Sequence, residues 1–126
     1  MGLTNTGRDF IAQAIINDTP TFFNNDNAHI GVGNGVTDYA ASQTDLVGAS
    51  KHRAGMEDTF PSRTNNVLTF KATFDTASSD FAWEEWGVFN AGPTGGIMLN
   101  RKKETLGTKS GGTWVLTVTL TIGIGS

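Results

Sequence analysis

Two neighbouring carboxylates, Glu84 and Glu85, are the residues of this sequence that come closest to a catalytic acid–base pair. They lie in an aromatic run, Phe81 to Asn90, that reads as a β-strand. Successive side chains of a strand point to opposite faces, so the two carboxylates cannot act together in one cleft. Without a bulge, Glu85 shares its face with Trp83 and Phe89.

A carboxylate among aromatic side chains is unstable unless a cation or several hydrogen-bond donors face it. We therefore expect Glu85 to have such a partner, and Arg53 is the candidate cation. The sequence thus predicts that Arg53 and Glu85 form a structural pair, not a catalytic one.

The other residues that could carry chemistry lack the spacing that the chemistry needs. In the segment Gly31 to Gly35, a dinucleotide fingerprint would need a third glycine at Val36 and a following helix. His29 and His52 are too far apart in sequence for a helical zinc motif. There is no cysteine and no Gly-x-Ser-x-Gly nucleophile motif. We expect no catalytic residue, no cofactor and no metal, and hence no enzyme.

The net charge and the lengths of the apolar stretches indicate which classes of partner are not expected. The net charge is −3, and the basic cluster Arg101-Lys102-Lys103 runs directly into Glu104, which is typical of a solvated turn. Such a chain does not suit nucleic acid, whose phosphates require a concentrated basic surface. No apolar stretch approaches the ~20 residues of a membrane helix, so no membrane partner is expected. The 126 residues fit one domain, 1–126.

One amphipathic helix is predicted near the start of the chain. Thr6 can cap it, Phe10 and Ala14 lie on one apolar face, and Pro20 follows its end. Its length of about three turns is too short for stability in isolation, so it must pack on an apolar surface.

Strands dominate the rest of the sequence. The segment Val67 to Phe74 alternates apolar and polar residues, as a half-buried strand does. The last strand has an inward face of Trp114, Leu116, Val118, Leu120 and Ile122 and an outer face of Val115, Thr117, Thr119 and Thr121. Further strand segments are expected at 28–33, 81–90 and 97–99, and the segment 105–107 is expected to lead into a turn at 109–112. The segment 37–61 is expected to be a crossing loop with a short helical or strand piece at 42–47.

These elements predict a mainly β (α+β) fold. The expected architecture is an antiparallel β-sandwich or sheet with one N-terminal amphipathic helix packed on it. The outer face of the last strand, residues Val115, Thr117, Thr119 and Thr121, is the candidate subunit interface.

The order of motifs resembles the N-terminal, virion-anchoring domain of phage tail-collar fibre proteins, over most of residues 3 to 100. The motifs are Leu3-Thr4-Asn5-Thr6-Gly7, His29-Ile30-Gly31-Val32-Gly33-Asn34-Gly35, Gln43-Thr44-Asp45-Leu46-Val47 with Arg53, and Glu84-Glu85-Trp86-Gly87-Val88-Phe89-Asn90 before Ile97-Met98-Leu99. Trp86 stands where the family usually has a smaller aliphatic residue. The family continues into a shaft and a receptor-binding tip, so we expect the anchoring module standing alone.

The resemblance implies a structural protein of the phage virion, assembled in the host bacterial cytoplasm. It implies a homo-oligomer, with a trimer as first choice, in contact with other tail, neck or capsid proteins. A capsid decoration protein, which binds the outer head as cement, is an alternative of similar composition. A carbohydrate-binding module is a third hypothesis, in which Trp83, Trp86 and Trp114 would stack on sugar rings.

Overall fold

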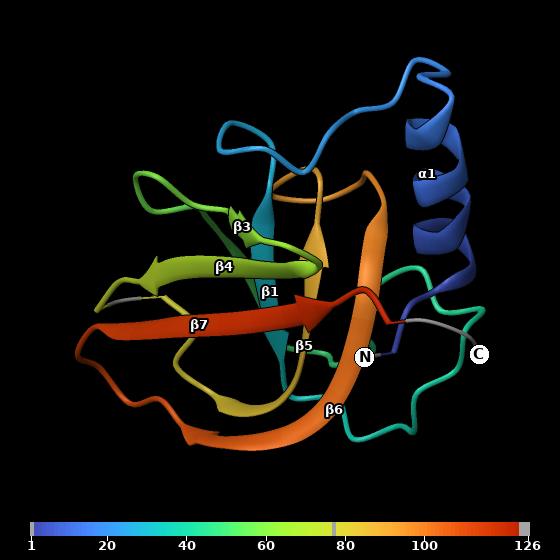
Figure 1. The fold of residues 1–126 in the computed structure, drawn as a ribbon. Helices are drawn as coiled ribbons and strands as arrows, with labels where there is room; N and C mark the ends of the chain where they lie inside the picture. Colours follow the sequence, from blue (N-terminus) through green and yellow to red (C-terminus); the bar gives the residue numbers. More distant parts are fainter. Residues whose placement is uncertain (1, 77, 124–126) are drawn as a thin grey trace.

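The computed structural model describes residues 2–76 and 78–123 and arranges them as two antiparallel β-sheets with one helix (Figure 1). The helix is α1 (Asn5–Ile15). One sheet has the order β2 (Lys51–Gly55), β1 (His29–Gly33), β5 (Ala82–Phe89), β6 (Met98–Thr108). The other has the order β3 (Ser62–Thr64), β4 (Val67–Phe74), β7 (Trp114–Thr121). The predicted fold class is confirmed.

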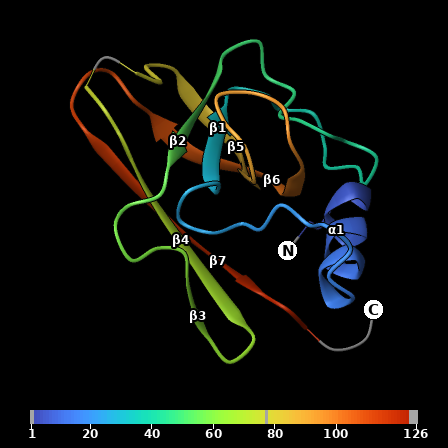
Figure 2. The same cartoon turned by 90° about the horizontal axis from the view of Figure 1, so that it is seen from above.

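The hydrophobic core lies between the two sheets. Viewed from above, β3, β4 and β7 form one layer, and β1, β5 and β6 form the other (Figure 2). The alternation predicted for residues 67–74 is confirmed, since Phe70, Ala72 and Phe74 are at most 1% exposed. They face Val118, Leu116 and Trp114 in register across the β4–β7 ladder.

The helix begins two residues earlier than predicted. Thr4, not Thr6, is the N-cap, and its hydroxyl accepts a hydrogen bond from the amide of Gly7 at 2.9 Å. The same hydroxyl donates to the carbonyl of Met98, so it also joins the helix start to β6. Thr6 was the weaker choice because only Thr4 can satisfy both the helix and the neighbouring strand.

The residues before the helix extend the sheet of β6. The amide of Arg101 donates to the carbonyl of Gly2 at 2.9 Å, and the amide of Thr4 donates to the carbonyl of Leu99 at 3.1 Å. Leu3 and Asn100 form the bridge between these two bonds. The N-terminal segment thus covers the start of an edge strand, whose backbone groups would otherwise face solvent.

Two strands of the structure were not predicted from the sequence pattern. The segment 37–61 contains β2, while residues 42–47 form neither helix nor strand. The short strand β3 was also missed. Both are exposed edge strands with polar residues, so the alternation that marks a half-buried strand is absent from them. Residues 98–99 and 105–107 prove to be parts of one strand, β6, which begins at Met98.

Close packing of α1 on β6 depends on Gly7. A methyl group at this position would lie 2.2 Å from the carbonyl oxygen of Leu99, which is backbone and cannot move aside. Gly7→Ala should therefore lower the free energy of unfolding, although alanine favours an isolated helix by about 1 kcal/mol over glycine. Urea denaturation followed by tryptophan fluorescence measures the change. A stabilised Gly7→Ala protein would contradict this account of the packing.

Candidate functional site

The best-defined polar cluster of the structure surrounds the carboxylate of Glu85, which is 0% exposed. One carboxylate oxygen accepts hydrogen bonds from the amides of Gly35 at 3.0 Å and Gly48 at 2.8 Å. The other accepts from the amide of Val47 at 3.0 Å and from Nε of Arg101 at 2.8 Å. Four donors, one of them a cation, therefore compensate the buried charge.

Glycine is required where the backbone approaches this carboxylate. A methyl group at Gly33 or at Gly35 would lie 2.5 Å from Oε2 of Glu85. At Gly35 it would also lie 2.6 Å from the amide nitrogen of Gly48. The glycine-rich segment 31–35 thus encloses a carboxylate of the protein itself. The strand β1 ends within it at Gly33, as predicted, but the residues that follow do not form the predicted turn.

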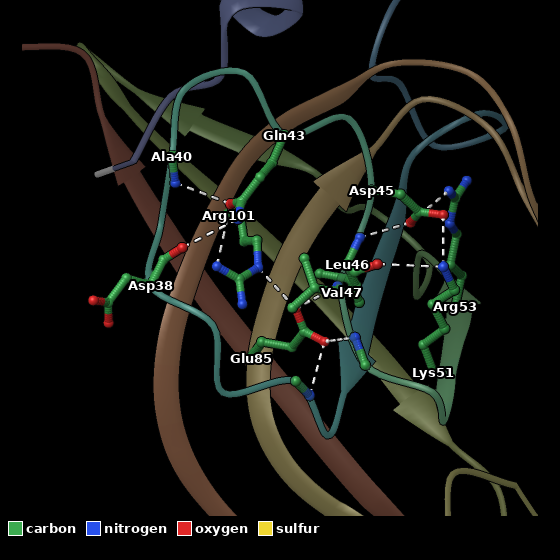
Figure 3. A network of polar contacts seen from close by, with 12 residues as sticks. Asp38, Ala40, Gln43, Asp45, Leu46, Val47, Lys51, Arg53, Glu85 and Arg101 are labelled. Carbon is green, nitrogen blue, oxygen red and sulfur yellow. Dashed lines mark hydrogen bonds and ion pairs between the residues drawn. The ribbon is translucent and has the colours of Figure 1, made fainter.

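Arg101 connects Glu85 to the crossing loop. Its Nη1 donates to the side-chain oxygen of Gln43 at 3.2 Å, and that oxygen also accepts from the amide of Ala40 at 3.0 Å. The side-chain nitrogen of Gln43 donates to the carbonyl of Asp38 at 3.1 Å. Figure 3 shows the side chains of Glu85 and Arg101 pointing toward one another beneath this loop. One buried ion pair thus holds residues 37–50 of this loop, which form no helix or strand.

Arg53 binds a different part of the same surface. Its Nη1 donates to the carbonyls of Ala91 at 2.7 Å and Gly95 at 2.8 Å, and its Nη2 lies 3.4 Å from a carboxylate oxygen of Asp45. The guanidinium carbon lies 3.6 Å from the centre of the Phe89 ring, a cation–π geometry. Arg53 therefore joins the crossing loop to the turn between β5 and β6.

The predicted pair of Arg53 with Glu85 is not formed. Glu85 does have the expected cation, but this cation is Arg101, and Arg53 binds Asp45 instead. The cluster 101–103 was interpreted as a solvated turn, whereas Arg101 is 0% exposed within β6. The signal that could have identified it is the hairpin of β5 and β6, which pairs Arg101 with Gly87, two residues from Glu85 on the same face.

A bulge explains the face on which Glu85 lies. The β5–β6 register shifts between Trp83 and Glu85, so Trp83 and Trp86 both enter the core between the sheets. Glu85 consequently lies on the opposite face of the sheet, with Phe89, and not on the face of Trp83. The face predicted for Glu85 depended on the absence of a bulge, and the bulge is present.

The remaining candidate residues do not converge on a pocket. His29 makes a hydrogen bond with the carbonyl oxygen of Asn27 at 2.8 Å, and His52 packs edge-on against Phe74. Within residues 2–76 and 78–123, no three His, Cys, Asp or Glu side chains gather as a metal site. Trp83 and Trp86 are 2% and 6% exposed, so they belong to the core and do not form a platform for sugar rings. No helix in this part of the chain is long and apolar enough to cross a membrane.

The outer face of β7 is exposed and uncharged, whereas the Glu85 cluster is buried and charged. The side chains of Val115, Thr117, Thr119 and Thr121 are all exposed, and Val115 is 53% exposed. The same strand buries Val118 and Leu120 in the core on its other face. The two-faced strand predicted from the sequence is present, with an uncharged outer surface. Ile122, which was predicted on the inward face, instead follows the strand and is 41% exposed.

Removing the charge of Glu85 should strongly destabilise the protein. Glu85→Gln leaves Arg101 buried without its anion and places an amide donor against amide donors, for an expected loss of about 3–5 kcal/mol in the free energy of unfolding. Glu84→Gln is the matched control, because Glu84 only accepts a bond from the exposed Thr105 hydroxyl, and it should cost less than about 1 kcal/mol. Equal losses in the two variants, measured by urea denaturation, would refute the structural role of Glu85.

Asp45 should make stability depend on pH in the acid range. Partial burial raises its pKa, but the Lys51 and Leu46 hydrogen bonds and the charges of Lys51 and Arg53 outweigh burial and hold the pKa below its ordinary value. A depressed pKa in the folded state contributes stability above the unfolded-state pKa, and this contribution is lost as the pH falls through the folded value.

We therefore expect wild type to exceed Asp45→Asn in unfolding free energy at pH 6, with the difference disappearing toward pH 3. The Asp45 side chain is 41% exposed, so solvent screening keeps the difference below about 1 kcal/mol. Denaturation curves of both proteins across this range provide the measurement. A difference that is constant with pH would contradict the assignment.

Comparison with known proteins identifies a family for this chain. A family model described as "Phage tail-collar fibre protein, N-terminal" matches residues 1–121. No curated protein and no solved structure gives a significant match. The family is one of structural phage proteins, and its members are components of the virion. The chain therefore belongs to the phage tail-collar fibre family and is a structural protein of the phage tail.

Proposed function

We propose that residues 1–126 act as one non-catalytic module that anchors a tail fibre, or assembles a tail component, through protein–protein contacts. The family match supports the tail location. The observation that carries the proposal is the outer face of β7, where Val115 and three threonines form an exposed, uncharged surface. Such a surface suits contact with another subunit, because apolar and hydroxyl groups pack without the desolvation of full charges.

The Glu85 cluster supports a non-catalytic function, because its carboxylate is buried and bonded within the protein. Both oxygens of Glu85 are occupied by donors of the protein itself, and Arg101 is likewise fully buried. A catalytic carboxylate must reach a substrate proton, whereas this one holds a loop in place. In the proposed function, the cluster gives the crossing loop a fixed shape that a neighbouring protein can recognise.

Two surfaces are available for two kinds of contact. The proposed subunit interface is the face of Val115, Thr117, Thr119 and Thr121, through which copies of the chain associate. The resemblance to tail fibres favours a trimer. A second surface is an apolar groove of about 250 Å³ between α1 and the end of β7, lined by Phe22 and Ile122 among others. It suits a different protein of the tail, and assembly would take place in the host cytoplasm.

Location and copy number in the particle test the proposal. We expect antibody labelling in electron micrographs of purified particles at the tail. Quantitative mass spectrometry against the major capsid protein should give a few dozen copies or fewer. Hundreds of copies spread over the head would contradict it and indicate a capsid decoration protein. Protection of tryptophan fluorescence from a soluble quencher by glycans would instead indicate carbohydrate binding.

A further inference from the structure

The strand β7 leaves one side of its backbone without a partner among the described residues. It pairs with β4 on one side, and no Cα atom of β6 lies within 8 Å of a Cα atom of β7. Beyond the strand, the amide of Ile122 donates to the carbonyl of Asn66 at 2.8 Å. Hydrogen-bonding pairs alternate along an antiparallel ladder, so Val118 and Leu120 also bond to β4.

The intervening residues consequently direct their amides and carbonyls away from β4. These residues are Val115, Thr117, Thr119 and Thr121. They are the same residues whose side chains form the exposed outer face. The open edge is eight residues long, or about 27 Å.

The other sheet edges in the described part of the chain are shortened, covered or charged. The strand β3 has only three residues, and the start of β6 is paired with the segment Gly2–Thr4. The edge strand β2 carries Lys51 and Arg53. These are the usual protections against edge-to-edge pairing. β7 has no charge, no proline and no bulge in its pairing with β4. A long, regular and uncharged edge of this kind is suited to pairing with another strand.

Space for such a strand exists beside the edge. A groove of about 650 Å³ lies between β7 and β6, and a second of about 260 Å³ continues along it. Trp86, Lys102 and Thr119 line both. The two grooves share these lining residues and therefore adjoin one another along the open edge.

We propose that the occupant of this edge is β7 of a second copy of the chain, paired antiparallel about a two-fold axis through Val118. In this register Thr117 faces Thr119 of the partner, and Val115 faces Thr121. On the inner face, Val118 faces its own copy. Threonine pairs and β-branched pairs are favourable across antiparallel strands, and no like charges meet. The strand thus complements itself, which is the requirement of a two-fold interface.

The inference deepens the proposed self-association and rests on it. The three strands of β3, β4 and β7 in one copy continue into the same three strands of the other, so one sheet spans both chains. Antiparallel pairing of a strand with its own copy requires a two-fold axis between the two chains. Neighbouring chains of a three-fold ring are not related by such an axis, so they cannot form this pair. The contact therefore gives a dimer, or it joins one trimer to another.

Disulfide cross-linking tests the register, because the chain has no cysteine of its own. Hydrogen-bonded pairs have Cα atoms about 5.5 Å apart, within disulfide range. Chains carrying Thr117→Cys or Thr119→Cys are mixed in equal amounts and oxidised mildly. We expect roughly half of the chains to cross-link, the statistical share of mixed pairs. Either variant alone should not cross-link, since its two cysteines lie more than about 7 Å apart.

Thr64→Cys, on the opposite edge of the same sheet, is the matched control. Cross-linking of Thr64→Cys with Thr117→Cys would show head-to-tail contact and overturn the two-fold pairing, while leaving self-association through β7 intact. An oligomer by solution mass without any cross-link would overturn pairing at β7 but not the proposed tail function. A monomer at micromolar concentration would overturn both the pairing and the self-association.

A pair of charge variants separates the contact from folding defects. The register sets position 117 against position 119 of the partner, so T117K/T119K places like charges together across the axis. T117K/T119E places opposite charges together. We expect the first variant to weaken the dimer at least about tenfold and the second to retain it, as measured by sedimentation. Equal weakening in both variants would overturn the register.

Discussion

The carboxylate of Glu85 is a full charge removed from water, and much of the structure around it is determined by the donors it requires. Three are backbone amides, from Gly35, Val47 and Gly48, and the fourth is Arg101. These donors come from two chain segments far apart in sequence. Because breaking a buried ion pair costs several kcal/mol, residues 37–50 of the crossing loop are held to the sheet although they form no helix or strand.

A second constraint on the structure is that the edge strands of the two sheets carry unpaired backbone groups. Unpaired strand edges invite association, and this chain covers the start of β6 with its own N-terminal residues, through a threonine that also caps α1. By contrast, β7 keeps a regular, uncharged edge and an exposed threonine-rich face. A tail protein must join other subunits, so the unprotected edge is consistent with assembly.

Strands in which apolar and polar residues alternate could be predicted from the sequence. The strands β4 and β7 alternate because one face of each is buried, and this alternation is visible residue by residue. The edge strands β2 and β3 bury little, so their sequences carry no such pattern. The bulge after Trp83 was missed for a related reason: it depends on pairing with β6 and not on the residues of β5 alone.

The residues alone indicate that a buried Glu85 needs a cation or several hydrogen-bond donors, and that β7 has two chemically different faces. These follow from the cost of burying a charge and from the period of a strand. That Arg101 is the cation, and that Arg53 binds Asp45, becomes visible only in the folded chain. The choice depends on strand register and on a bulge, which bring together residues distant in the chain, and local sequence does not encode such distances.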